Sequence, residues 1–432
     1  MRVRGADLAA AGAALGLVAL SGLAGGILYL AGHPVHASSA PFTAHWLPHL
    51  GPGTPLAVAT AVLVIWHGPR LAAALPWRRL LGLTYAVAAV WILSLALVDG
   101  WRRGVADRLT TRHEYLSEVG GVIDVRAMLR GFTGRILDFQ PDSWTTHVAG
   151  HPPGALLVFV GLDRVGLGGG GWAALTCVAV GALCAVAVPV TLRALGDEVA
   201  ARAAVPFLVL FPGAVWIGVS ADGLFAGVTA TGLALLAVAA RRNSLVIGLG
   251  AGLLLGGGLF LSYGLVLLAV PALAVVLLAG RLRPVIAALA GAAVVVTAFT
   301  LAGFWWLDGY HLVTVRYYQG VASVRPYAYW IWADLALVAV CAGPAAAVIL
   351  RRAAIKRPWP RPVVLLPAAA LLAILAADVS GYSKAEVERI WLPFAVWLLA
   401  GAVLIPPAGR RFWLVAQAAV ALLVNHLLLT TW

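Results

Sequence analysis

The feature that most constrains this chain is a series of apolar runs, several close to twenty residues long, spread over its whole length. A helix of about 20 apolar residues spans the hydrocarbon core of a bilayer. Apolar residues make up 62% of the 432 residues and charged residues only 11%, whereas soluble domains carry about 25% charged residues. The chain is therefore predicted to be an all-α polytopic membrane protein. The apolar runs are 8–31, 53–67, 79–98, 172–192, 203–219, 222–240, 245–280, 285–307, 329–350, 363–378, 390–405 and 412–430.

One run, 245–280, is longer than a single crossing of about 20 residues requires. We expect two helices there, interrupted at the glycines 256–258 or at residues 262–264. This gives about thirteen transmembrane helices, in one integral membrane domain that covers residues 1–432.

The longest polar interval is 99–153, which is rich in acids and arginines. Most connections between helices need about 4–6 residues, so this interval is predicted to be a large extracytoplasmic loop that carries the chemistry, with juxtamembrane helices. The apolar segment 154–167 is too short to span a bilayer. Because Pro152 and Pro153 give it a rigid start, we expect a juxtamembrane or re-entrant helix.

The formal net charge of +13 would suggest a nucleic-acid partner in a soluble protein. Here most arginines lie at the ends of apolar runs, where they set orientation and contact lipid headgroups. Placing connections such as Arg241 with Arg242 and Arg281 with Arg283 in the cytoplasm leaves the 99–153 interval outside. No nucleic acid is expected, and membrane lipids are. Rich usage of Ala, Gly, Val and Arg favours a bacterium, so we expect a multi-pass protein of the cytoplasmic (inner) membrane.

Three carboxylates are candidates for catalysis. Glu114 lies in the polar interval, where a carboxylate at the membrane surface can act as general base for an acceptor hydroxyl. Asp99 lies where an apolar run meets the same interval. Asp222 begins another run, where a helix N-terminus stabilises a carboxylate. The alternatives are a solvated loop acid for Glu114, ordinary helix-end polarity for Asp99 and a plain N-cap at 220–222.

Histidines near the polar interval raise the question of a metal site. A zinc-protease helix needs His-Glu-x-x-His, but Ser117 stands where the second histidine would follow His113 and Glu114. His147 and His151 are four residues apart, but the glycine and prolines that flank His151 disfavour a helical ligand pair. No metal ligand is assigned, and the need for a divalent ion such as Mg²⁺ or Mn²⁺ is left open.

Two later polar segments combine cations with aromatic or acidic residues. Arg316 precedes Tyr318, and Arg325 precedes Tyr327, in a segment predicted to be an outer loop. Such arginines can bind a phosphate at headgroup depth while the tyrosines cover the face of a sugar. The alternative is an aromatic belt with snorkelling arginines. Segment 382–394 brings acids and an arginine to the mouth of a further run, where burial is costly and therefore indicates function.

Four motifs in this order resemble those of the GT-C superfamily of integral membrane glycosyltransferases. The nearest branch includes the protein O-mannosyltransferases and the lipid A aminoarabinose transferases. The motifs are His113-Glu114-Tyr115-Leu116, His151-Pro152-Pro153-Gly154-Ala155-Leu156, Asp222 at a helix start, and Arg389-Ile390-Trp391-Leu392-Pro393. The resemblance covers roughly residues 79–395. The chain departs from the family in lacking an acid pair at Glu114 and in having two extra helices before the expected first one.

The resemblance implies transfer of a sugar from a polyprenyl-phosphate donor to an acceptor hydroxyl on the extracytoplasmic side. Glu114 would be the base, with Asp99 or Asp222 as alternatives or orienting groups. Mannose or arabinose would suit such a donor, and a glycolipid, a polysaccharide or a protein would suit as acceptor. No residue distinguishes among them.

Arg389, with Arg316 and Arg325, would hold the donor phosphate and stabilise it as leaving group. Further contacts to the substrates are expected from Tyr115, His151, Tyr318, Tyr327 and Glu388.

Two other classes of protein remain as alternatives. A transporter or flippase would show inverted repeats with interrupted helices and ionisable groups near the midplane. Here only the run 245–280 is expected to be interrupted, and most ionisable residues lie at the ends of runs, with Asp334 as an exception. A scaffold protein would use the outer interval to bind partners and would tolerate loss of the candidate residues.

Overall fold

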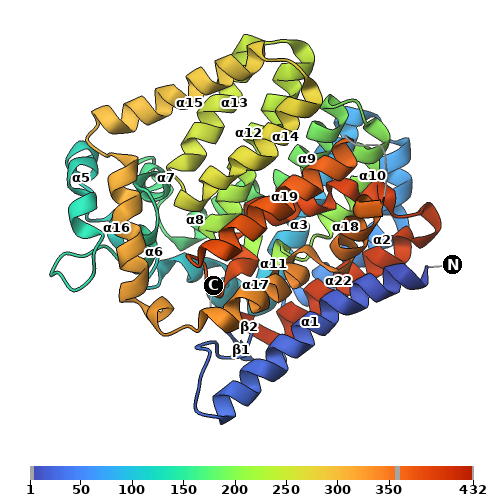
Figure 1. Ribbon diagram of the computed structural model, residues 1–432, viewed down its shortest axis with the longest axis horizontal. Coiled ribbons are helices and arrows are strands. Elements are labelled where there is room, and N and C mark those ends of the chain that lie inside the picture. Colours follow the sequence, from blue (N-terminus) through green and yellow to red (C-terminus); the bar gives the residue numbers. More distant parts are fainter. Residues whose placement is uncertain (1–3, 356–360, 431–432) are drawn as a thin grey trace.

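The computed structural model describes residues 4–355 and 361–430 and is built almost wholly from helices (Figure 1). The predicted all-α class is confirmed. Three helices precede the polar interval, namely α1 (Gly5–Leu30), α2 (Thr54–Ala74) and α3 (Trp77–Ala96). The interval itself folds into short pieces, namely η1 (Leu97–Asp99), η2 (Arg102–Ala106), η3 (Arg108–Thr110), α4 (Leu116–Val119), α5 (Val125–Gly131), η4 (Thr133–Arg135) and α6 (Thr146–Gly150).

The rest of the chain contains both long helices and short helical pieces. They are α7 (Pro153–Arg164), α8 (Gly170–Gly181), α9 (Cys184–Ala194), α10 (Glu198–Val209), α11 (Ala214–Ile217), α12 (Ala221–Arg242), α13 (Leu245–Leu259), η5 (Tyr263–Leu268), α14 (Ala269–Ala279), α15 (Arg283–Leu301), α16 (Trp306–Gln319), η6 (Val321–Ser323), α17 (Tyr327–Ala342), α18 (Pro344–Ile355), α19 (Pro362–Ser380), α20 (Val387–Ile390), α21 (Leu392–Ala395), η7 (Val396–Leu404), η8 (Pro407–Gly409) and α22 (Arg410–Leu427). Helix α7 begins at the expected prolines, and its depth in the membrane stays a prediction.

Seven helical segments are long and apolar enough to cross a membrane, or eight if the bent pair α17 and α18 forms one span, in the part of the chain described. Shorter apolar helices cover Leu245–Leu259, Tyr263–Ala279 and Leu392–Leu404. The predicted count of about thirteen is therefore not confirmed, because several apolar runs are not continuous helices. The run 203–219 breaks at Pro212 and Gly213, between α10 and α11. The interruption expected in 245–280 is present, between α13 and η5.

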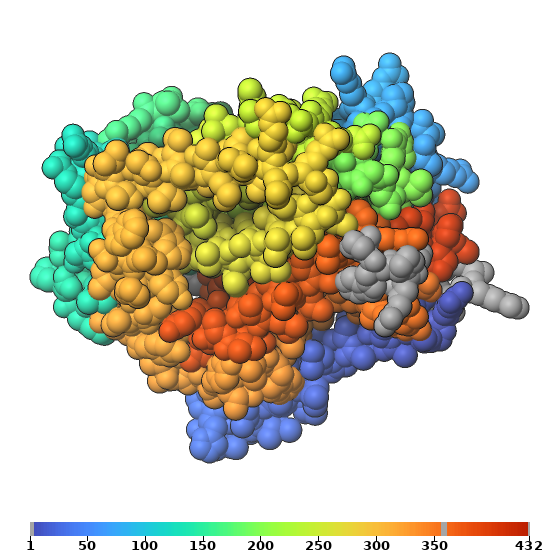
Figure 2. All heavy atoms as spheres, turned by 45° about the horizontal axis from the view of Figure 1, so that its top comes forward, coloured from blue at the N-terminus to red at the C-terminus, as the bar shows by residue number. Residues whose placement is uncertain are grey.

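Helix α12 is the most enclosed of these candidate spans. In the most apolar 18-residue stretch of α12, 78% is buried inside the molecule, against 11% in that of α1. Helix α1 lies along the edge of the molecule (Figure 2). Small residues let the neighbours of α12 approach closely, and Gly227 lies against the backbone of Val180. Helices α8, α9, α13, α14 and α21 all pack against α12. The start of α12, and with it Asp222, is therefore placed inside the molecule.

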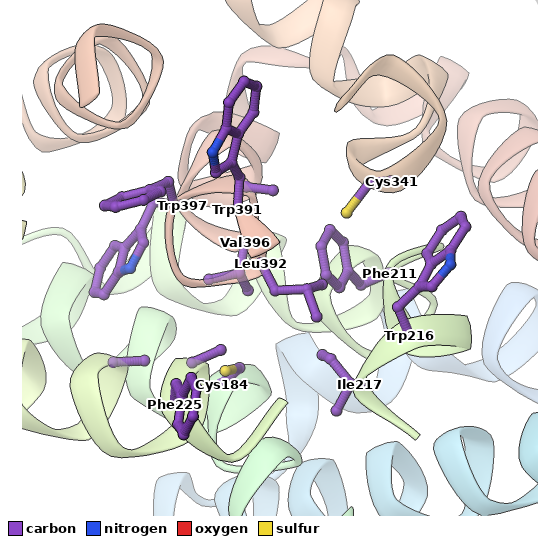
Figure 3. Close-up of a cluster of buried hydrophobic side chains, with 14 of the residues drawn as sticks. Cys184, Phe211, Trp216, Ile217, Phe225, Cys341, Trp391, Leu392, Val396 and Trp397 are labelled. Carbon is purple, nitrogen blue, oxygen red and sulfur yellow. The ribbon is translucent and has the colours of Figure 1, made fainter. Parts of the chain in front are cut away.

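A cluster of buried apolar side chains joins the start of α12 to the segment from α20 to η7 (Figure 3). Phe225, Trp391 and Leu392 belong to this cluster, and each is at most 2% exposed. Fully burying an apolar side chain of this size contributes about 1.5–3 kcal/mol. The cluster therefore holds Asp222, one turn before Phe225, at a constant position relative to Arg389, just before Trp391.

Two short strands form the one regular sheet of the described residues. Strand β1 (Ala44–Trp46) pairs antiparallel with β2 (Leu428–Thr430), so that Ala44 lies opposite Thr430. A two-stranded ribbon is marginally stable by itself. Here Arg108 Nη1 donates a hydrogen bond to the carbonyl of Thr430 at 2.6 Å. The run 412–430 was expected to be a single helix, and this expectation is wrong for its last residues because they extend to pair with β1.

The run 329–350 is expected to be one span, but the chain bends by 103° between α17 and α18. Gly343 lies at the bend with a φ of +79°, and Pro344 begins α18. Glycine reaches positive φ without steric cost, and proline cannot donate the backbone hydrogen bond that would continue α17. The expectation of a continuous helix is wrong because this pair interrupts the backbone within an unbroken apolar run.

Replacing Gly343 with alanine should destabilise the fold. The positive φ alone costs about 1–3 kcal/mol for a residue with a Cβ, and the new methyl group would collide with the amide oxygen of Gln417. We expect a lower midpoint of thermal unfolding for Gly343→Ala in detergent micelles. Gly257→Ala is the control, because no atom lies within 4 Å of its added Cβ. Equal midpoints of thermal unfolding for Gly343→Ala and Gly257→Ala would contradict the role of Gly343 at the bend.

Candidate active site

The guanidinium of Arg389, on α20, lies at the centre of the candidate site. Its Nη1 donates a hydrogen bond to Asp222 Oδ2 at 2.6 Å, and its Nη2 donates to Glu386 Oε2 at 2.8 Å. Arg389 is 7% exposed and Asp222 is 4% exposed. A buried cation needs paired charges and hydrogen bonds to offset its lost hydration. The two carboxylates supply both.

Asp222 is available for this contact because another residue caps α12. Ser220 Oγ accepts a hydrogen bond from the backbone N–H of Gly223 at 3.3 Å and is the N-cap. The plain N-cap considered for 220–222 therefore exists, but Ser220 provides it. The carboxylate of Asp222 is left to bind Arg389.

A second arginine approaches the carboxylate of Glu386. Arg325 Nη2 lies 3.2 Å from Glu386 Oε1, so this carboxylate bridges Arg325 and Arg389. Arg325 Nη1 also donates to the carbonyl of Lys384 at 2.7 Å. In turn, Lys384 Nζ donates to the carbonyls of Ala322 at 2.6 Å and Arg325 at 3.1 Å. Three cationic side chains therefore surround the segment that carries Glu386.

Glu114 joins the same network through a histidine. Its Oε1 lies 3.0 Å from His147 Nδ1, and both side chains are buried. The backbone N–H of His147 donates to the carbonyl of His113 at 3.0 Å, which holds α6 beside the turn that carries Glu114. His147 Nε2 lies 3.4 Å from Arg389 Nη2. One imidazole therefore links the loop carboxylate to the central guanidinium.

Aromatic rings enclose one side of this network. The ring of Tyr115 lies 6.0 Å from that of His147, 5.8 Å from that of His151 and 5.3 Å from that of Phe159, measured between centroids. His151 Nδ1 donates to the carbonyl of His147 at 2.8 Å, and its ring lies 5.6 Å from the ring of Phe225. The His-Pro-Pro motif therefore holds an aromatic wall against α12.

Burial changes the acidity of two groups in this wall. It raises the pKa of Tyr115 well above the ordinary value, and the negative charges of Asp222 and Glu114 act in the same direction. Burial lowers the pKa of His151 to about 4, although the charge of Asp222 opposes this shift. Both side chains are therefore neutral at physiological pH and serve as neutral hydrogen-bonding and packing groups.

The two acids of segment 382–394 that flank Val387 differ in charge. Burial by itself would raise the pKa of Glu386, but the positive charges of Arg389 and Arg325 hold it below its ordinary value. Burial raises the pKa of Glu388 to about 8. At neutral pH Glu386 is therefore ionised and Glu388 mostly protonated.

Asp99 belongs to a different cluster of charges. Its carboxylate lies 3.1 Å from His49 Nε2, 2.9 Å from Arg103 Nη2 and 3.3 Å from Arg108 Nη2. These partners come from η2, η3 and the segment before α2. The contacts of Asp99 therefore stabilise the C-terminal end of α3 and are distinct from those of Arg389.

Four other candidate residues make no described contact with Arg389. Arg316 forms an ion pair with Asp138 of the polar interval. The segment that carries Arg316 was expected to be a loop, but it is helix α16. Tyr318 is 48% exposed, and Tyr327 donates its hydroxyl hydrogen to the carbonyl of Val379 at 3.1 Å. Glu388 Oε2 has no hydrogen-bond partner among the described residues.

Most acids of the polar interval have structural roles. Glu118 Oε1 accepts a hydrogen bond from the backbone N–H of Thr145 at 3.0 Å. Asp124 caps α5, and Asp142 lies 3.8 Å from Arg135. Among them, Glu114 is the acid whose described contacts lead to Arg389.

His147 and Glu386 are part of the network although the sequence analysis did not select them. Glu386 carried a signal, because side chains three residues apart on a helix face each other and Arg389 follows at that spacing. His147 was considered only with His151 as a metal pair. The structure places it between an acid and an arginine instead.

In the described part of the chain, no group of three or more His, Cys, Asp or Glu side chains lies close enough to hold a metal ion. The histidines considered as ligands, His147 and His151, contact aromatic and charged side chains. The structure therefore assigns no metal ligand.

Comparison with solved structures finds chains of similar fold. The chain is similar to the solved oligosaccharyltransferase of Archaeoglobus fulgidus, in its complex with Zn and sulfate, with 13% identity and a TM-score of 0.41. The alignment covers 79% of this chain and 51% of that chain, so this chain spans about half the length of that enzyme. No family model matches the sequence, and no curated protein matches it.

Removing Arg389 should destabilise the protein strongly. Arg389→Ala leaves Asp222 and Glu386 buried without their cation, and breaking a buried pair in this way costs about 3–5 kcal/mol. Adding Asp222→Asn should recover part of that loss, because one of the two unpaired charges is then removed. Chemical or thermal unfolding of the single and double variants measures this coupling.

The control is Arg316→Ala, whose partner Asp138 has a side chain 36% exposed. An exposed pair contributes about 0–1 kcal/mol, so this variant should be nearly as stable as the wild type. Strict additivity of Arg389→Ala and Asp222→Asn would show that the pair is not coupled.

Acid should destabilise the folded state through His151. Its pKa is about 4 when folded, against 6.5 for an unperturbed histidine, so between these values the unfolded chain binds a proton that the folded chain excludes. The free energy of unfolding should fall by about 1–3 kcal/mol as the pH decreases across this range. His151→Gln keeps a donor for the His147 carbonyl but does not titrate, so its unfolding should depend less on pH. If the free energy of unfolding changes with pH identically in the wild type and in His151→Gln, His151 is not the group responsible.

Proposed function

We propose that this protein is an integral membrane glycosyltransferase of the GT-C type. It would transfer a sugar from a polyprenyl-phosphate donor to a hydroxyl of a cell-envelope acceptor. The observation that carries the proposal is that Glu114, Asp222 and Arg389 come from three separate motifs and meet in one buried network with His147. His151, from the remaining motif, packs on Tyr115 beside it. If the four motif resemblances were accidental, the residues of these motifs would have no reason to meet in one network.

The pair of Glu114 and His147 suits proton transfer. Glu114 takes the proton of the acceptor hydroxyl as the acceptor oxygen attacks the anomeric carbon of the donor. His147 orients the carboxylate, with Nδ1 lying 3.0 Å from Glu114 Oε1 and Nε2 facing Arg389. The bond between the anomeric carbon and the phosphate oxygen breaks, and the polyprenyl phosphate leaves with the electron pair.

Arg389 and Arg325 can stabilise the negative charge that develops on that leaving group. Guanidinium groups bind phosphate oxygens through paired hydrogen bonds, and fixed donors stabilise charge that develops in a transition state. Asp222 orients Arg389 from the start of α12. Arg316, paired with Asp138, lies outside this role.

The proposed reaction takes place on the outer side of the cytoplasmic membrane of a bacterium. The excess of basic residues in the short connections supports this orientation for the 99–153 interval. Mannose or arabinose is the sugar that the family resemblance favours. A glycolipid, a polysaccharide or a protein is the acceptor class.

Transport of a lipid-linked or envelope substrate is the second candidate function. The observation in its favour is the bent pair α17 and α18, which adds an interrupted span to the breaks after α10 and after α13. Movement of a polyprenyl-phosphate sugar across liposomes that contain the purified protein, without any sugar transfer, would favour transport.

Glu114→Gln should abolish most sugar transfer. Loss of a general base lowers the rate by about 10²–10⁴-fold, while the amide keeps the size of the side chain. The assay incubates the purified protein with radiolabelled polyprenyl-phosphate sugars and envelope acceptors, with and without EDTA.

Glu118→Gln is the control, because Glu118 lies in the same interval but bonds to the backbone of Thr145. It should retain wild-type transfer. Full activity of purified Glu114→Gln would remove Glu114 from the role of base.

A further inference from the structure

We propose that the space between Arg325 and Arg389 is a phosphate-binding site that the carboxylate of Glu386 fills in the resting protein. A phosphate group would displace Glu386 when it binds. This inference rests on the proposed function for the identity of the ligand, a lipid-linked phosphate. It adds the role of Glu386, which the sequence motifs do not assign.

The geometry of Glu386 is that of a bound oxyanion. Its two carboxylate oxygens contact two different guanidiniums, Oε1 at 3.2 Å from Arg325 Nη2 and Oε2 at 2.8 Å from Arg389 Nη2. Phosphate presents several anionic oxygens that accept the same charge-assisted hydrogen bonds. The carboxylate therefore occupies the position in which a phosphate would contact both arginines.

Repulsion between anions favours departure of Glu386 from this position. At present Asp222 and Glu386 together offset the charges of Arg325 and Arg389. A phosphate added beside Glu386 would place two anions next to each other in a buried site, which is unfavourable. With Glu386 displaced, the phosphate takes over the pairing of both arginines, and Lys384, held by neutral carbonyls, adds a further positive charge.

The backbone around Glu386 stores the energy for this displacement. Ala385 has a φ of +68° and Glu386 a φ of +62°, although neither is glycine. Each such residue costs about 1–3 kcal/mol and persists only where its surroundings impose it. Movement of Glu386 would let both residues return to ordinary backbone angles.

Specific contacts impose these backbone angles. The backbone N–H of Lys384 donates to Tyr317 Oη at 2.8 Å, and that of Ala385 donates to Asp334 Oδ1 at 3.0 Å. These bonds anchor the residues just before Glu386 from α16 and α17. The two bonds therefore hold Ala385 and Glu386 in the strained conformation, and displacement of Glu386 would loosen them as the backbone angles relax.

Exposure distinguishes the two carboxylates. The side chain of Glu386 is 13% exposed, against 9% for Arg389, 8% for Arg325 and 6% for Asp222. Glu386 is thus the more accessible of the two carboxylates that pair with Arg389. Glu386 is therefore the displaceable carboxylate, and Asp222 the permanent one.

The test measures binding of undecaprenyl phosphate to the full chain in detergent micelles, with undecaprenol as the neutral probe. Glu386→Gln should bind the phosphate about tenfold more tightly than the wild type, because the competing resident anion is gone. It should bind undecaprenol unchanged. Arg325→Ala should bind the phosphate more weakly. Unchanged or weaker phosphate binding by Glu386→Gln, or equal tightening for undecaprenol, would overturn the proposal.

Asp138→Asn is the matched control, since it also frees an arginine from its carboxylate partner, but at Arg316. It should bind undecaprenyl phosphate like the wild type, and a comparable gain there would show that any freed arginine suffices. Inorganic phosphate is the second probe. A gain for both phosphates assigns the site to the phosphate group itself, and a gain for the lipid alone assigns it to a lipid headgroup.

Wild-type protein provides a second measurement if Glu386→Gln fails to fold. Hydrogen exchange of the peptide that contains Ala385 and Glu386 should become faster on addition of undecaprenyl phosphate, and unchanged or slower exchange would overturn the proposal. Neither measurement depends on sugar transfer. Tighter phosphate binding without transfer would therefore refute the proposed enzyme function while leaving this site intact.

Discussion

The interaction on which the rest of the structure depends is the pairing of a buried arginine with carboxylates from distant parts of the chain. Arg389 loses its hydration, and Asp222 and Glu386 compensate for it. This pairing requires α12 to begin deep in the molecule, where Ser220 caps it. It also requires the apolar cluster beneath, in which Phe225 and Trp391 hold the two segments together (Figure 3). The central position of α12 and the geometry of the site are thus consequences of one requirement.

The fold could be predicted from apolar runs where each run is one uninterrupted helix, as in α1, α12 and α19. It could not where glycine and proline break the backbone within a run, as at Gly343 and Pro344 or at Pro212. Apolarity reports the free energy of moving side chains out of water. It does not report whether successive backbone hydrogen bonds can form. The strand β2 was not predicted because its partner β1 lies near the other end of the chain, and pairing between distant segments leaves no local pattern.

The candidate site was predictable where a charge stood at the edge of an apolar run or within a polar interval between two runs. This selected Glu114, Asp222 and Arg389, which the structure brings together. The same reasoning also selected Asp99 and Arg316, which bind other partners. In sequence these residues are equivalent, because an ion pair between distant segments leaves no local pattern. Spacing could indicate only the contact between Glu386 and Arg389, since they lie within one turn.

The pairing of β1 with β2 has a consequence for the order of events during biosynthesis. The ribosome makes residues 44–46 early, but their partner strand emerges only after α22 has been synthesised. Contacts between residues so far apart in sequence form late in folding. Arg108, beside Asp99, likewise obtains its bond to the Thr430 carbonyl only then. The C-terminal end of α3 is therefore completed after the helical bundle, and a ribosome that stalls before α22 would leave that region without its last contacts.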